Sequence, residues 1–132
     1  RTPPDVLEEV VMVDDGSSTT LESSFDTVGV TAAARAAKKI RILRHRDTLG
    51  LMVAKKTGGD ASKGSIIVFF DCHVSPQPNW YVEITRLIEE NPKRMVVPAI
   101  TDLDLDTWEE TKNSNVNTKC YLTWSVEFDW FN

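Results

Sequence analysis

The chain has 132 residues, of which 41% are hydrophobic and 27% charged, and its formal net charge is −5. This length suits one domain. The apolar runs of the sequence exclude low-complexity disorder, and two distant cysteines are too few for a disulfide-built mini-protein. No apolar stretch approaches the ~18–20 residues that cross a membrane, and the acidic balance argues against nucleic-acid binding, which needs a basic face.

The first part of the chain predicts two strands separated by a helix. Residues 9–13 form an apolar, β-branched run that the turn-forming cluster 14–18 stops. The alanine-rich segment 21–39 has strong helix propensity. Residues 40–43 alternate partly between apolar and polar side chains, which predicts a second strand.

A second helix and the clearest strand come next. Residues 49–56 have a helical pattern, and we expect Gly58 and Gly59 to end that helix. Residues 65–70 are almost continuously apolar, which is typical of a strand buried on both faces of a parallel sheet. Prolines at positions 76 and 78 forbid its continuation.

The remaining elements complete an alternating pattern. Residues 79–90 predict a helix with apolar side chains at helical spacing, and residues 95–100 predict a fourth strand. Residues 121–131 could form one more strand. The order β-α-β-α-β-α-β predicts an α/β fold with a doubly wound, mainly parallel sheet and right-handed crossovers, in one domain without a linker.

Polar side chains follow two of the predicted strands. Asp14 and Asp15 follow the first strand, while Asp71 and His73 follow the third. Ligands of open parallel sheets bind outside the carboxyl ends of the strands. A nucleotide-binding protein could use one cluster for a base or ribose and the other for a metal on phosphates. Asp15 and Asp71 could equally cap the turns or helices that follow them.

The Asp71-Cys72-His73 motif has a specific chemistry. In extended backbone Asp71 and His73 point to the same side while Cys72 turns away. A carboxylate oxygen and an imidazole nitrogen suit Mn²⁺ or another borderline divalent ion. Such an ion would bridge two phosphates and neutralise the charge on a leaving diphosphate.

These residues stand in an ordered series that resembles one protein family. The opening segment 5–18 resembles that of GT-A glycosyltransferases and, more narrowly, of the polypeptide N-acetylgalactosaminyltransferases. The similarity keeps its order over nearly the whole chain. The further matching positions are residues 40–44, 50–52 and 63–73, Trp80, residues 96–100 and 106–108, Trp124, Phe128 and Trp130.

The resemblance implies a Rossmann-like nucleotide-diphospho-sugar transferase (GT-A) fold and a Mn²⁺-dependent reaction. GalNAc would pass from UDP-GalNAc to serine or threonine of a protein, with retention at the anomeric carbon. By residue-for-residue match Asp15 would contact the uracil side of the nucleotide, and Gly50 and Lys55 would lie at the nucleotide-sugar. Asp71 and His73 would bind the metal and the diphosphate.

The sequence departs from the family at several cationic positions. The family has an arginine before the Gly-Leu pair and more in the following helix, where this chain has Thr48, Val53, Lys55 and Thr57. Lysine does not reproduce the bidentate contact of arginine with phosphate, and threonine or valine still less. A non-catalytic relic that binds nucleotide-sugar is therefore one alternative.

The resemblance also implies that residues 1–132 are one part of a larger enzyme. We expect the family's first strand before Arg1, and the acceptor half and lectin domain after Asn132. The third metal ligand and the catalytic residues would lie in that later half, so this chain alone should not turn over. The parent would be a Golgi-lumen enzyme whose membrane anchor lies upstream.

A phosphoacceptor receiver domain is an alternative from another class. It would use Asp14 and Asp15 as paired acids and Asp71 as the phosphorylated residue, but no Lys-Pro follows a fifth strand. The remaining polar features have plainer interpretations. His45 lies in a basic stretch typical of a solvated face, and Cys72 and Cys120 are expected to be free thiols.

Overall fold

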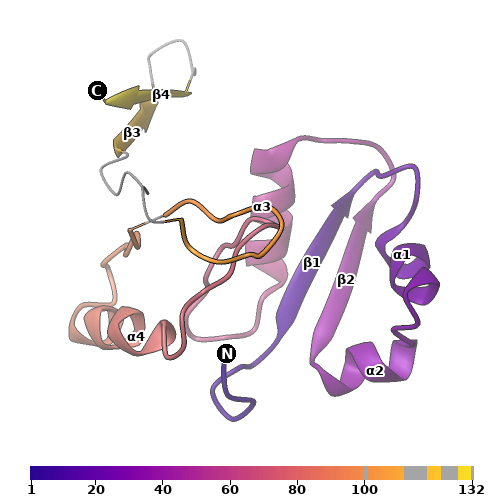
Figure 1. Ribbon diagram of the computed structural model, residues 1–132, viewed down its shortest axis with the longest axis horizontal. Helices are drawn as coiled ribbons and strands as arrows, with labels where there is room; N and C mark the ends of the chain where they lie inside the picture. The colour runs from indigo at the N-terminus through magenta and orange to yellow at the C-terminus, as the bar shows by residue number, and fades with distance from the viewer. Residues whose placement is uncertain (100, 112–118, 123–127, 132) are drawn as a thin grey trace.

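The computed structural model describes residues 1–99, 101–111, 119–122 and 128–131 (Figure 1). None of the helices in these ranges is long and apolar enough to span a bilayer. The elements in chain order are β1 (Val10–Asp15), α1 (Leu21–Thr27), α2 (Ala32–Ala37), β2 (Ile40–His45), α3 (Leu51–Ala61), α4 (Tyr81–Glu90), β3 (Lys119–Leu122) and β4 (Phe128–Phe131).

The first two predicted strands form a parallel pair. The register runs from Val10 opposite Ile40 to Asp15 opposite His45. Both strands extend two polar residues beyond the predicted apolar runs, so acidic residues end β1 where basic residues end β2. Figure 1 shows α3 on one side of this pair and α1 and α2 on the other. The predicted α/β class with a parallel sheet is confirmed in this part of the chain.

The segment between β1 and β2 contains two short helices instead of the single predicted helix. Gly29 has a positive φ of 74°, which breaks the helical path. Thr31 then caps α2, because its hydroxyl accepts a hydrogen bond from the Ala34 N–H. A glycine in the left-handed region followed by a capping threonine explains the interruption.

Helix α3 continues through the two glycines that were expected to end it. A Cβ atom at Gly58 would lie 3.3 Å from Val13 of β1, and one at Gly59 would lie 3.1 Å from Phe69. Both glycines therefore let the helix approach its neighbours closely. The prediction of a helix end here was wrong, because close packing rather than a C-cap requires these residues.

The predicted strands at 65–70 and 95–100 are absent from the described residues; Ile100 itself lies outside them. A β-strand needs backbone hydrogen bonds to a neighbouring strand. In the described residues the parallel sheet contains only β1 and β2. Phe69 and Phe70 are consequently about half exposed, at 54% and 46%. The Phe70 ring packs instead on Trp80, with 5.0 Å between ring centroids.

The C-terminal part of the described chain forms a hairpin where one strand was predicted. Strands β3 and β4 pair antiparallel, from Lys119 opposite Phe131 to Leu122 opposite Phe128. Figure 1 shows this hairpin at the end of the molecule away from β1 and β2. Trp124 lies outside the described residues.

Candidate functional site

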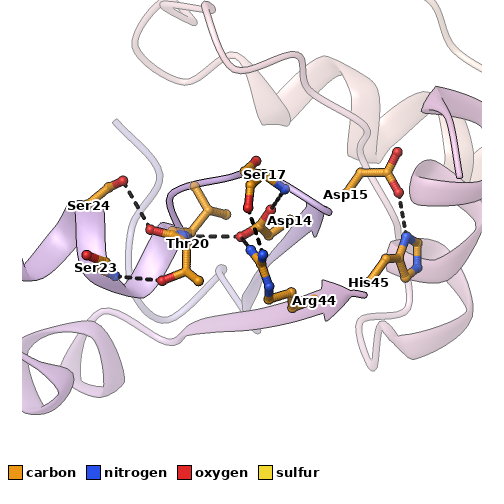
Figure 2. A network of polar contacts seen from close by, with 9 residues as sticks. Asp14, Asp15, Ser17, Thr20, Ser23, Ser24, Arg44 and His45 are labelled. Carbon is orange, nitrogen blue, oxygen red and sulfur yellow. Dashed lines mark hydrogen bonds and ion pairs between the residues drawn. The ribbon is translucent and has the colours of Figure 1, made fainter. Parts of the chain in front are cut away.

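The two aspartates at the end of β1 have different roles. Side chains alternate along a strand, so Asp14 and Asp15 face opposite ways (Figure 2). Asp14 is 2% exposed, forms an ion pair with Arg44 and accepts hydrogen bonds from the Ser17 and Leu21 N–H groups. Chiefly the Ser17 N–H bond lowers the pKa of Asp14 to about 2. Asp14 thus holds the turn and the start of α1.

Asp15 lies on the other side, 20% exposed, and is held by three donors. His45 Nδ1 lies 2.6 Å from its Oδ1 atom (Figure 2). The Leu49 N–H donates to both carboxylate oxygens, and the Gly50 N–H donates to Oδ2 at 2.8 Å. The hydrogen bond with His45 is the largest cause that lowers the pKa of Asp15. The carboxylate is therefore ionised and fixed.

Asp15 keeps capacity for a further donor. Two carboxylate oxygens offer about four lone-pair sites. His45, Leu49 and Gly50 supply three donor groups, and Leu49 shares its N–H between the two oxygens. Three donor groups on about four lone-pair sites leave the carboxylate able to accept from one more N–H.

The loop after β2 is packed tightly against the end of β1. Gly16 has a φ of 78°, and a Cβ atom there would lie 2.7 Å from the Thr48 nitrogen. Gly50, which the family resemblance places at the nucleotide-sugar, also has a positive φ of 93° and precedes α3. The structure therefore brings Gly50 and Asp15 together through a direct hydrogen bond.

His45 is a site residue that the sequence interpretation missed. Its side chain is 13% exposed, so the prediction of a solvated position was wrong. Its Nδ1 atom faces Asp15 and its Nε2 atom lies 3.0 Å from the Thr57 hydroxyl. The sequence feature that could have indicated this role of His45 is charge pairing, since two acidic residues end β1 and basic residues lie opposite them on β2.

Asp71 has a charged partner on α3. Lys55 Nζ lies 3.1 Å from Asp71 Oδ1, so α3 supplies a partner to Asp71 as well as one to His45. Cys72 Sγ lies 3.6 Å from His73 Nδ1. The expectation that Cys72 turns away from its neighbours was therefore wrong, because residues 72 and 73 form a bend instead of extended strand. Cys72 is a free, exposed thiol, as expected.

The donor set of Asp71 and His73 fits a borderline divalent ion in chemistry but supplies only two ligands. Among the described residues no group of three or more His, Cys, Asp or Glu side chains could hold a metal. Further ligands would have to come from phosphate oxygens, water or residues elsewhere. The partner of the Asp71 carboxylate in the structure is the Lys55 ammonium.

Comparison with known proteins identifies the family of this site. The model of glycosyl transferase family 2 matches residues 4–130. The chain belongs to this glycosyltransferase family. Its GT-A-like α/β fold is present in part, as the parallel β1–β2 pair with its helices. Membership favours a transferase over a receiver domain, in which Asp71 would be the phosphate acceptor.

The similar curated proteins are N-acetylgalactosaminyltransferases. The chain is 34% identical over 110 residues to probable N-acetylgalactosaminyltransferase 7 of Caenorhabditis elegans, covering 83% of this chain and 18% of that protein. It is 32% identical over 136 residues to polypeptide N-acetylgalactosaminyltransferase 13 of Rattus norvegicus, covering 99% and 23%. The chain thus spans about a fifth of the length of these relatives.

Proposed function

We propose that the protein containing this chain transfers GalNAc from UDP-GalNAc to serine or threonine of a protein, retaining the anomeric configuration, with Mn²⁺ as cofactor. The observation that carries this proposal is the fixed, ionised Asp15 at the carboxyl end of β1, in a chain whose similar relatives are polypeptide N-acetylgalactosaminyltransferases. We also propose that the enzyme acts in the Golgi lumen, as the family resemblance implies.

Asp15 supports recognition of the uracil side of the nucleotide. The remaining acceptor capacity of its carboxylate suits the imide N–H of uracil, because an ionised carboxylate only accepts hydrogen bonds. His45, Leu49 and Gly50 keep the carboxylate in one orientation before the ligand arrives. Such preorganisation reduces the entropy lost on binding.

Asp71, His73 and Lys55 support binding of the diphosphate. Asp71 and His73 would hold Mn²⁺, which supplies electrostatic stabilisation of the leaving diphosphate. The Lys55 ammonium, 3.1 Å from Asp71, would then be free to face a phosphate oxygen. Lysine binds phosphate as a point charge without the planar fork of arginine.

A transfer assay tests the proposed reaction. The full-length protein is incubated with UDP-GalNAc, Mn²⁺ and a serine/threonine peptide, and the peptide is analysed by mass spectrometry and by NMR of the anomeric proton. We expect one N-acetylhexosamine per acceptor site in the α configuration of the donor, and none on a control peptide with alanine at those sites. Transfer from a different sugar nucleotide, or a β-linked product, would contradict the donor or the stereochemistry proposed.

A relic that binds the nucleotide-sugar without transferring it is the second candidate. It is favoured by Thr48, Val53 and Thr57, which stand where the family resemblance implies arginines. In the structure the Thr57 hydroxyl contacts His45. The two candidates differ in one result. UDP-GalNAc binding without any transfer to the peptide would support the relic.

A further inference from the structure

The contact chain Asp15–His45–Thr57 connects three elements at the candidate nucleotide site. Asp15 ends β1, His45 ends β2 and Thr57 lies in α3. The His45 ring has a partner at each nitrogen, at 2.6 Å and 3.0 Å. These two contacts hold the ring with its Nδ1 atom facing the Asp15 carboxylate.

The protonation of the ring follows from its partners. Asp15 is ionised and only accepts hydrogen bonds, so His45 Nδ1 must carry a proton. The Thr57 hydroxyl can either donate to Nε2 or accept from it, and therefore satisfies the ring in both of its charge states. The other charged groups of α3 have partners away from the ring, since Lys55 pairs with Asp71 and Lys56 with Asp60.

We propose that His45 is a positioning residue for nucleotide binding: it holds Asp15 Oδ1, with Thr57 holding the ring, and so keeps the Asp15 carboxylate in one orientation for the ligand. The identity of the ligand rests on the proposed function, whereas the hold on Asp15 does not. A hydroxyl, an imidazole and a carboxylate in this order also form the catalytic groups of some hydrolases, where the hydroxyl is the nucleophile. Such a nucleophile needs free N–H groups nearby to stabilise an oxyanion, and the backbone N–H groups around Thr57 are bonded within α3. We therefore assign the Thr57 hydroxyl to orienting the ring.

Replacement of His45 separates positioning from mere packing. His45→Ala removes the donor to Asp15, and we expect UDP affinity to fall at least about tenfold, the low end for a hydrogen bond to a charged group. In His45→Asn an amide N–H occupies roughly the place of Nδ1. This variant should recover UDP affinity to within about threefold of wild type, although it lacks the bond to Thr57.

Two further variants complete the design. Thr57→Val preserves shape and removes only the hydroxyl, and we expect UDP affinity to fall by roughly two- to fivefold because the ring keeps its bond to Asp15. Lys56→Ala is the matched control, since this exposed residue lies next to Thr57 in α3 and pairs only with Asp60 among the described contacts. Its UDP affinity should equal that of wild type.

Affinities are measured by calorimetry with UDP, and the Leu49 and Gly50 amide signals are followed by ¹H–¹⁵N NMR without ligand. These amides report the Asp15 carboxylate directly. Movement of both signals in His45→Ala and their return in His45→Asn supports the proposal. Unmoved signals, or a His45→Asn variant as weak as His45→Ala, would overturn it. If wild type does not bind UDP, the proposed function fails, while the amide signals still decide whether His45 holds Asp15.

Discussion

Gly16→Ala tests the close packing that brings the loop after β2 against the end of β1. The new methyl group would lie 2.7 Å from the Thr48 nitrogen and 2.8 Å from the Asp47 carbonyl carbon, and both contacts are with backbone. The φ of 78° adds strain of about 1–2 kcal/mol for a residue with a Cβ atom. Overpacking adds about 1–3 kcal/mol, so we expect a total loss of about 2–5 kcal/mol.

Gly29→Ala is the matched control for this prediction. Its φ of 74° is nearly the same, but a Cβ atom there has nothing within 4 Å. We therefore expect a loss of only about 1 kcal/mol, since the strain is partly offset by the lower entropy of the unfolded chain. Urea unfolding followed by circular dichroism measures both variants. Equal losses in Gly16→Ala and Gly29→Ala would refute the close approach of Thr48.

Three more predictions follow from described contacts. Asp14 has a pKa of about 2 in the folded protein, so its contribution to stability is complete above about pH 4 and is lost as the pH falls toward 2. Asp14→Asn should therefore reduce the pH dependence of the free energy of unfolding between about pH 4 and pH 2. An unchanged pH dependence in this variant would contradict the assignment. Thr31→Ala should cost about 1 kcal/mol of unfolding free energy and Thr31→Ser much less, because only serine retains the hydroxyl that caps α2; equal losses would exclude the cap. Lys55→Ala should change the free energy of unfolding by less than about 1 kcal/mol, since the ion pair of Lys55 with Asp71 is exposed. The same variant should weaken UDP binding roughly tenfold in calorimetry. An unchanged UDP affinity would show that Lys55 does not belong to the site.

The local elements of the fold were predictable to different degrees. The apolar runs of β1 and β2 and the apolar spacing of α4 identify these elements in the sequence, because each pattern is contained within the element. Gly58 and Gly59 misled the prediction because their role depends on Val13 and Phe69, which are distant in sequence. Residues 65–70 have strand character, but a strand also needs a partner, which local composition cannot supply.

The candidate site was predictable in its residues and not in their connections. Asp15 and Asp71 could be located because they follow apolar runs. The role of His45 depends on the parallel register, which places it opposite Asp15. Likewise, Asp14 and Asp15 are indistinguishable by composition, and only the alternation of side chains in β1 separates the buried structural carboxylate from the accessible one.

A calorimetric titration of UDP into this chain, with and without Mn²⁺, tests the nucleotide-site assignment most directly. We predict that UDP binds more tightly when Mn²⁺ is present and that Asp71→Ala abolishes this difference, because the carboxylate would hold the ion against the diphosphate. Lys56→Ala should behave as wild type. UDP affinity that is the same with and without Mn²⁺, or a metal effect that survives in Asp71→Ala, would contradict the assignment.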